Sequence, residues 1–211
     1  MVVLFLDKNF FNLDSDVVLI CVYISPENSA YYNGREQDTM SVLQDVLIEI
    51  RTEYGFVDII LAGDFNSKTG DLEDYVENDS LRYIQDIEIY EPDIFNIRRY
   101  NLDKEINNYG RQLIDLLKTY GIHLLNGRFP GDREGNYTCF ANRGKSAVDY
   151  IAISTPLFQY IADFSVLNFD ESDHFPIKCK INLKTSNKAQ NIECVYNIAK
   201  YIGIKSTMID I

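Results

Sequence analysis

The first half of the chain alternates between continuous apolar runs and one amphipathic segment. Residues 17–24 form an unbroken apolar run that stops at Ser25-Pro26, as expected of a strand buried on both faces. Apolar residues then recur at intervals of three and four, which predicts a helix that begins at Asp38 or Thr39 and ends at Gly55: Met40, Leu43, Val46, Leu47 and Ile50. Residues 57–62 form a second buried strand, and this strand, helix, strand order is typical of layered α/β proteins.

The second half is predicted to be mostly strands. Region 71–109 has no clean period and mixes acidic residues with Tyr, Asn and Pro92, so we interpret it as a long surface excursion. A short helix, with apolar residues at 113–120, is predicted to end at Gly121. The predicted strands that follow are 122–125, 136–140, 147–153, 164–169 and 177–183, with hairpin-turn chemistry at 142–145.

The composition turns polar at 184, where we place the end of the domain. We therefore expect an ordered domain over 1–183 and a polar linker and tail over 184–211. The segment 191–211 is compatible with a short amphipathic helix.

Composition supports one globular domain, and the net charge is unfavourable for binding nucleic acid. The chain has 211 residues, of which 46% are hydrophobic, enough for one substantial core. Its formal net charge is -12. Region 71–105 contains eleven acidic and four basic residues, so it carries a net charge of -7. Because affinity for a phosphate backbone comes largely from Lys and Arg, tight binding of nucleic acid without a metal ion would be surprising, although such a substrate is not excluded.

Cysteine usage and the amino-terminal residues favour an intracellular protein. No C-x-x-C pair is present, so we expect buried thiols in a reducing compartment rather than a disulfide framework. The cysteines are Cys21, Cys139, Cys179 and Cys194. The apolar run 2–6 is too short for a signal peptide or a membrane span, so we expect a nuclear or cytoplasmic protein that is neither secreted nor membrane-bound.

Gly63-Asp64-Phe65-Asn66 stands at the carboxyl end of a predicted buried strand. Such turns present side chains to an open edge of the sheet, where a carboxylate can hold a hard cation or align a water and an amide can donate to a phosphate oxygen. Taken alone, the motif is also compatible with a structural Asx turn.

A second candidate is Ser172-Asp173-His174, just before another predicted strand. A carboxylate beside an imidazole offers a metal ligand next to a group that can hydrogen-bond a phosphoryl oxygen. Taken alone, an Asp-His pair in a loop is more often a solvated turn. The other histidine, His123, lies in a strand pattern and is interpreted as structural.

Asp149 is the one charged residue inside the apolar strand 147–153. Burying a lone carboxylate is costly unless it is paired, so Asp149 should have a partner. A histidine ring N–H is the natural candidate, as in catalytic pairs in which the acid fixes the tautomer.

Together these motifs resemble the endonuclease/exonuclease/phosphatase superfamily, and most of all the endonuclease domains of non-LTR retrotransposons and the craniofacial-development-protein-like sequences related to them. The resemblance covers about 2–183 and implies a four-layer α/β/β/α sandwich of two mostly antiparallel sheets. Its motifs, in the family's order, are V-Y-I-S-P at 22–26, G-D-F-N at 63–66, N-G-R at 126–128, V-D-Y at 148–150 and S-D-H at 172–174.

The resemblance implies a catalytic role for five residues. Asp64 would orient or deprotonate the attacking water while Asn66 holds a phosphate oxygen. Asp149 would pair with His174, which stabilises the transition state of phosphoryl transfer, and Tyr23 would contact the scissile phosphate.

It also implies a metal ion and a nucleic-acid substrate. Asp173 and Asp64 would be the metal ligands, and the ion would be Mg²⁺, with Mn²⁺ possible. DNA would be the partner, with Arg143 and Lys145 as phosphate contacts in the loop before the V-D-Y strand.

One departure limits the functional prediction. The family begins with a strand bearing an Asn and a second bearing the Glu that is its principal metal ligand, and neither matches this chain, so the amino-terminal part of the domain is expected to be missing. We therefore expect impaired DNA nicking, with two alternatives: an inactive or partner-binding remnant, and a phosphodiesterase or phosphatase acting on a lipid or inositol phosphate. An exposed sheet edge is also expected, where a protein partner or a second copy would bind.

Overall fold

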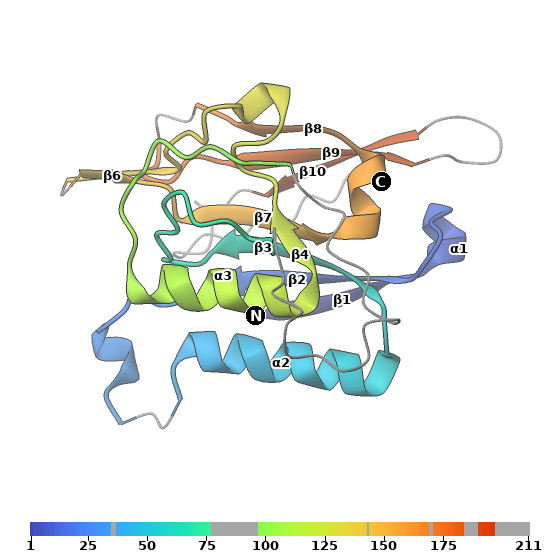
Figure 1. Cartoon of the computed structure of the whole chain (residues 1–211), viewed down its shortest axis with the longest axis horizontal. Coiled ribbons are helices and arrows are strands. Elements are labelled where there is room, and N and C mark those ends of the chain that lie inside the picture. Colours follow the sequence, from blue (N-terminus) through green and yellow to red (C-terminus); the bar gives the residue numbers. More distant parts are fainter. Residues whose placement is uncertain (35–36, 77–96, 143, 169–170, 184–189, 197–211) are drawn as a thin grey trace, which may run out of the picture.

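Two β-sheets lie face to face, with two long helices on the outer side of the larger sheet (Figure 1). The computed structural model describes residues 1–34, 37–76, 97–142, 144–168, 171–183 and 190–196. The larger sheet has the spatial order β1 (Val2–Leu6), β2 (Val17–Tyr23), β3 (Asp58–Asp64), β7 (Asp149–Ser154) and β4 (Ile122–Leu124). The smaller sheet consists of β10 (Gln190–Tyr196), β9 (Ile177–Leu183) and β8 (Ile161–Val166).

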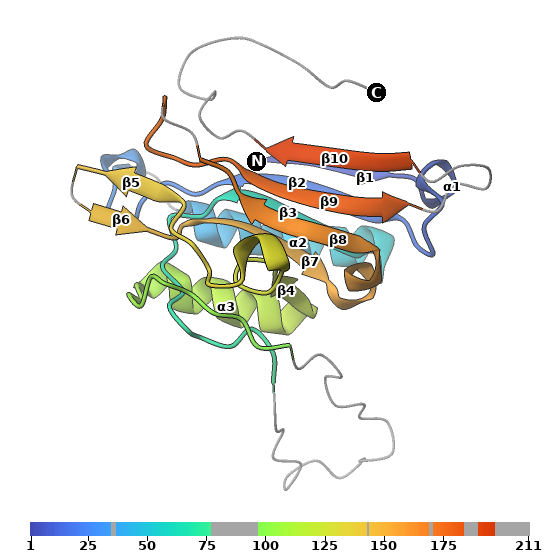
Figure 2. The same ribbon diagram turned by 90° about the horizontal axis from the view of Figure 1, so that it is seen from above.

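A hairpin of β5 (Cys139–Ala141) and β6 (Gly144–Ser146) projects from one end of the sandwich (Figure 2). The helices are α1 (Lys8–Phe11), α2 (Thr39–Tyr54) and α3 (Asn108–Tyr120), with 3₁₀ turns η1 (Ala30–Tyr32), η4 (Pro130–Asp132) and η5 (Thr155–Tyr160). The described helices are too short or too polar for any of them to cross a membrane.

Only β2 and β3 pair in parallel among the described strands, which confirms two mostly antiparallel sheets. The parallel pair is joined by α2, as the strand, helix, strand pattern predicted. Asp38 caps α2 by accepting a hydrogen bond from the backbone N–H of Ser41 at 2.8 Å, and Gly55 follows its last turn.

The central strands are buried on both faces and divide their side chains between two cores. Ile59 and Leu61 of β3 face α2 and α3, whereas Ile60 and Ala62 face the smaller sheet. This division follows from the two-residue period of a strand. It explains why these strands appear in the sequence as continuous apolar runs.

The smaller sheet supplies the third layer of the expected sandwich (Figure 2). Among the described residues, helical contacts to this sheet come from the short turns η4 and η5. Residues 191–196 belong to the tail that was considered compatible with a short amphipathic helix, and residues 190–196 instead form strand β10, paired along its length with β9. Its alternation of Ile192 and Cys194 with polar Glu193 suits a strand that extends an existing edge. Residues 197–211 lie outside the described residues.

Part of the predicted surface excursion at 71–109 is buried. Arg99, Asn101 and Asp103 are at most 5% exposed, so the prediction of a surface loop was wrong for this part. The backbone N–H of Ala147 donates to the Asp103 carboxylate at 3.0 Å. Polar residues buried by such pairing have no hydrophobic period, which is why the pattern was misleading. Residues 77–96, which hold most of the acidic charge, lie outside the described part.

Strand β1 forms one edge of the larger sheet and keeps its apolar side chains exposed. Val2, Val3, Leu4 and Phe5 are between 39% and 49% exposed. An uncharged, exposed edge strand is a site for further pairing. The expected exposed edge is therefore present, and its occupant stays a prediction.

Candidate active site

Three of the predicted residues lie in one row across the larger sheet. Tyr23 pairs with Asp64 across β2 and β3, and Asp64 pairs with Asp149 across β3 and β7. Residues in register across neighbouring strands point to the same face. That face is turned toward the smaller sheet, because Ala62 and Ile151, two positions along the same strands, lie in the core between the sheets.

The G-D-F-N turn follows directly from this row. Gly63 has φ +150°, and a Cβ placed on it would lie 1.9 Å from the carbonyl oxygen of Val22, so the close approach of β2 and β3 requires glycine. Asn66 adopts a left-handed conformation with φ 46°. Its side-chain amide donates to the Ile24 carbonyl at 2.8 Å and to the Asp64 carboxylate at 3.1 Å, which fixes its orientation.

Asp149 and His174 form the expected pair. His174 Nδ1 lies 3.1 Å from both carboxylate oxygens of Asp149. The Asp149 side chain is fully buried, and that of His174 is 22% exposed. The hydrogen bond that His174 donates to the Asp149 carboxylate, together with its hydrogen bond to Cys139, raises the pKa of His174 to about 11, so the imidazole is a stable cation near neutral pH.

Asp64 is a buried carboxylate that forms no ion pair with a described Lys or Arg. Burial, followed by the charge of Asp149, raises its pKa to about 7. Tyr23 next to it is 57% exposed, and burial of its hydroxyl, then Asp64, raises its pKa, so the hydroxyl stays protonated and able to donate. The row therefore offers a group that titrates near neutral pH beside a neutral donor.

The loop that carries His174 is held as an additional short strand beside β5. The backbone N–H of Phe140 donates to the carbonyl of Asp173 at 2.7 Å, and Cys139 lies opposite His174 in an isolated bridge. Cys139 was expected only as a buried apolar residue. It is buried at 8% exposure, yet its place beside His174 was missed, because no motif in the sequence links the two.

The predicted metal ligands lie in two overlapping groups. Asp64, Asp149 and His174 offer ligand atoms within 4.8 Å of one another, and exposed Asp173 belongs instead with His174 and Cys139. Among the described residues, no group joins Asp64 with Asp173. Carboxylate oxygens suit Mg²⁺, which keeps several waters and takes one or two carboxylates, so the residues present fit this ion by donor type.

Lys145, one of the two predicted nucleic-acid contacts, lies on β6 of the β5–β6 hairpin. Lys145 Nζ stands 4.3 Å from the centre of the Tyr137 ring, and its side chain is exposed. Phe140 is 45% exposed and stacks on Phe175 at 4.6 Å between ring centres. Arg143 lies outside the described residues.

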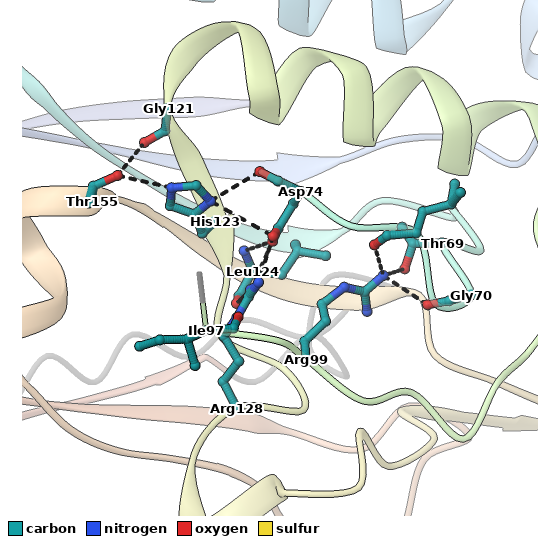
Figure 3. A network of polar contacts seen from close by, with 11 residues as sticks. Thr69, Gly70, Asp74, Ile97, Arg99, Gly121, His123, Leu124, Arg128 and Thr155 are labelled. Atoms are coloured by element: carbon teal, nitrogen blue, oxygen red, sulfur yellow. Dashed lines mark hydrogen bonds and ion pairs between the residues drawn. The ribbon is translucent and has the colours of Figure 1, made fainter. Parts of the chain in front are cut away.

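A buried ion pair supports the loop that follows the G-D-F-N turn (Figure 3). Asp74 accepts two hydrogen bonds from Arg128, at 2.6 and 2.8 Å, and one from the backbone N–H of Leu124 at 2.8 Å. Although burial opposes its ionisation, the hydrogen bonds from Arg128 and His123 hold the pKa of Asp74 well below its usual range. His123 is fully buried in this network, as its structural interpretation predicted.

Arg99 holds the same loop from the other side. Its Nη2 donates to Thr69 Oγ1 at 2.8 Å and to the carbonyls of Gly70 and Leu72 at 2.8 and 3.1 Å (Figure 3). Pattern analysis missed this residue because it lies in the stretch interpreted as a surface excursion. Arg99 and Arg128 therefore position the loop without reaching the row of carboxylates.

Comparison with solved structures identifies the fold. The chain is similar to the catalytic domain of Xenopus laevis APE2, with a TM-score of 0.52 and 17% identity over 84% of this chain and 51% of that one. It is also similar to the endonuclease domain of TRAS1, a telomere-specific non-LTR retrotransposon, with a TM-score of 0.50 and 18% identity over 87% and 69% of the two chains. A 3'-5' exonuclease from Neisseria meningitidis matches at a TM-score of 0.48 and 17% identity, over 79% of this chain and 61% of that one.

The first two of these matches give the fold, a sandwich of the endonuclease/exonuclease/phosphatase type. The chain spans only about half to two thirds of the length of the three proteins. The family model described as endonuclease-reverse transcriptase matches residues 17–178. The chain belongs to this family, within the endonuclease/exonuclease/phosphatase superfamily. A search of curated protein sequences finds no match.

Proposed function

We propose that this domain is a metal-dependent phosphodiesterase that nicks DNA. The observation that carries the proposal is the buried Asp149–His174 pair beside Asp64, with its hydrogen bonds of 3.1 Å. A fixed cation next to a carboxylate that titrates near neutral pH provides the two charges that phosphodiester hydrolysis requires.

Asp64 would take the proton of the attacking water. A general base works best when its pKa lies near the operating pH, and burial places the pKa of Asp64 at about 7. Asn66 is held against Asp64 by its own side-chain amide and by its backbone N–H at 2.9 Å. These two bonds keep the carboxylate in one orientation, so the water that it accepts would approach the phosphorus from a fixed direction.

His174 would stabilise the charge that develops on the phosphoryl oxygens. With a pKa of about 11 it remains protonated throughout the neutral range, so its contribution is electrostatic and needs no proton transfer. Tyr23, exposed at the end of β2, would donate its hydroxyl hydrogen to the scissile phosphate.

A divalent ion, when bound, would neutralise charge on the phosphate and stabilise the leaving oxygen. We infer that Asp64 contributes to holding it from inside the row. Asp173 lies in the other group, with Cys139 and His174, so it would reach the same ion only by turning toward the row. With only these carboxylates, affinity for Mg²⁺ without substrate should be weak, since the ion demands a nearly complete set of oxygens.

DNA is the proposed substrate because the hairpin beside the site combines a cation with an exposed aromatic ring. Lys145 offers a phosphate contact, and Arg143 is proposed as a second one. Phe140 presents a ring face of the kind that stacks on bases. The likeness to a retrotransposon endonuclease domain agrees with this proposal.

The test is nicking of supercoiled plasmid in Mg²⁺. Asp64→Ala and His174→Ala should each lower the rate by about 100-fold or more, because each removes a charge at the reacting centre. Asp115 is an exposed carboxylate on α3, so Asp115→Ala is the matched control and should nick at the wild-type rate. Equal nicking rates in the wild type and the three variants would refute the proposal. Hydrolysis of an inositol phosphate without nicking would show that the substrate is an inositol phosphate and not DNA.

The exposed β1 strand favours a second candidate, a partner-binding fragment without activity. Its four exposed apolar residues and open edge suit pairing with another strand. Binding of an apolar dye that is lost on adding a partner, with no nicking in Mg²⁺ or Mn²⁺, would support this candidate.

A further inference from the structure

Cys139, Asp173 and His174 converge on one point from two different elements. Cys139 lies on β5, and the other two precede β9, held opposite it by the bridge between Cys139 and His174. The thiol sulfur, a carboxylate oxygen and a ring nitrogen lie within 4.8 Å of one another. Asp173 is exposed, so the group opens to solvent on its side.

This set of atoms differs chemically from the carboxylate row. A thiolate with an imidazole and a carboxylate selects borderline or soft ions such as Zn²⁺, whereas Mg²⁺ prefers oxygen atoms alone. Tetrahedral bonds of 2.0 to 2.3 Å place such ligands about 3.6 Å apart. The ligand atoms would therefore have to approach one another by at most about 1 Å, and a rotation of the exposed Asp173 side chain can bring its oxygen closer to the other two.

Asp149 already provides the support that a metal-binding histidine needs. Ligating histidines almost always donate their other ring N–H to a carboxylate or carbonyl, which fixes the tautomer and the ring orientation. Asp149 is fully buried and receives one ring N–H of His174 at 3.1 Å, which leaves the other ring nitrogen for a cation.

We propose that Cys139, Asp173 and His174 form a second cation site, which takes a thiophilic divalent ion such as Zn²⁺ and shares His174 with the active site. Binding releases two protons to solvent, one from the Cys139 thiol and one from the His174 ring nitrogen that takes the ion, and a water completes the tetrahedron. An ion in this site occupies the imidazole, so it blocks the role of His174 toward a phosphate. This consequence rests on the proposed function, whereas the binding itself does not.

The binding test uses Co²⁺ as a coloured substitute for Zn²⁺. The wild-type protein should show a thiolate-to-cobalt charge-transfer band in the near ultraviolet together with the intense visible bands of four-coordinate cobalt. Cys139→Ser removes the sulfur with little change of volume and should abolish the charge-transfer band. Cys21→Ser, on β2 outside the group, is the matched control and should keep it.

Affinities for Zn²⁺ give the second measurement, by competition with a chromogenic chelator. We expect a loss of at least about 100-fold in Cys139→Ser and of about 10- to 100-fold in Asp149→Asn, which removes only the support of the ring. Should Cys139→Ser fail to fold by circular dichroism, Asp173→Asn on the exposed side should still weaken binding by at least about 10-fold.

A wild-type protein without the charge-transfer band, or a band that survives Cys139→Ser, would overturn the proposal. Zn²⁺ should also inhibit nicking in Mg²⁺ by the wild type and much less by Cys139→Ser, each compared with its own zinc-free rate. A protein that never nicks but shows the cobalt band would refute the proposed function and leave the cation site standing.

Discussion

Replacement of Asp149 by Asn should return His174 to ordinary histidine behaviour. In the wild type, Asp149 as the main cause and Cys139 as the second raise the pKa of His174 to about 11, against 6.5 for an unperturbed imidazole. Asn keeps the shape of the side chain and removes its charge. The pKa of His174 in Asp149→Asn should therefore fall well below its wild-type value, although the remaining contact with Cys139 still favours the cation while burial opposes it.

The magnitude follows from the pKa difference. From 6.5 to about 11, at 1.36 kcal/mol per pH unit, the pair could contribute about 6 kcal/mol at most. The ring is 22% exposed, so solvent screening reduces this to about 2–3 kcal/mol. Because the folded pKa lies above the unfolded one, this stability is complete below about pH 6.5 and is lost as the pH rises toward 11.

The assay is a ¹H–¹⁵N titration of the imidazole nitrogens between pH 5 and 10, which is simple because the chain has two histidines. His174 should remain protonated across the range in the wild type and titrate in Asp149→Asn. His123→Gln assigns the two sets of signals. Urea unfolding at pH 6 and at pH 9.5 measures the stability difference, which should be larger at pH 6.

A wild-type His174 that titrates near pH 6.5 would refute the reasoning, because the carboxylate would then not hold the ring as a cation. An unchanged titration in Asp149→Asn would do the same. In either case the proposed electrostatic role of His174 would have to be replaced by proton transfer.

Three further changes test other parts of the site. Asp64→Asn should raise the free energy of unfolding by about 1–3 kcal/mol at pH 8 and by little at pH 4. Burial and Asp149 raise the pKa of Asp64 to about 7, so its ionisation at pH 8 opposes folding. Equal gains in stability at both pH values in urea unfolding would contradict this. Asp74→Asn should cost about 3–5 kcal/mol because it leaves Arg128 buried without its counterion, and an unchanged thermal midpoint would argue against the buried pair. Lys145→Ala should weaken DNA binding about equally for all sequences and lower the salt dependence by about one counterion, as measured by fluorescence anisotropy; a change for one sequence alone would show a base contact instead.

The layered architecture could be predicted because its strands are buried on both faces. Runs 17–24 and 57–62 correspond to β2 and β3, and the spacing of apolar residues between them predicted α2 to within a residue or two. The burial of Asp149 in an apolar strand required a partner, and the resemblance to the superfamily implied that this partner is His174.

Other features could not be predicted because they depend on contacts between distant segments. Arg99 is buried through carbonyls of a loop that precedes it by about 30 residues, and no local pattern marks such a contact. Cys139 comes to His174 because β5 pairs with the loop before β9, and the register of that pairing has no signature in composition. Strand β10 was missed because a polar segment precedes it, although pairing with β9 needs only backbone groups and an open edge.

The charges of the row explain how a strongly acidic protein could act on a polyanion. Asp64 and Asp149 supply two buried negative charges, and His174 compensates one of them. The negative charge that remains must be neutralised by a proton or by a cation. The pKa of Asp64, raised to about 7, shows that a proton is held there in the absence of a cation. A phosphodiester that bound beside Asp64 without a cation would add a further negative charge where one negative charge is already uncompensated. Substrate and cation should therefore bind together, and the net charge of -12 opposes DNA only while that cation is absent.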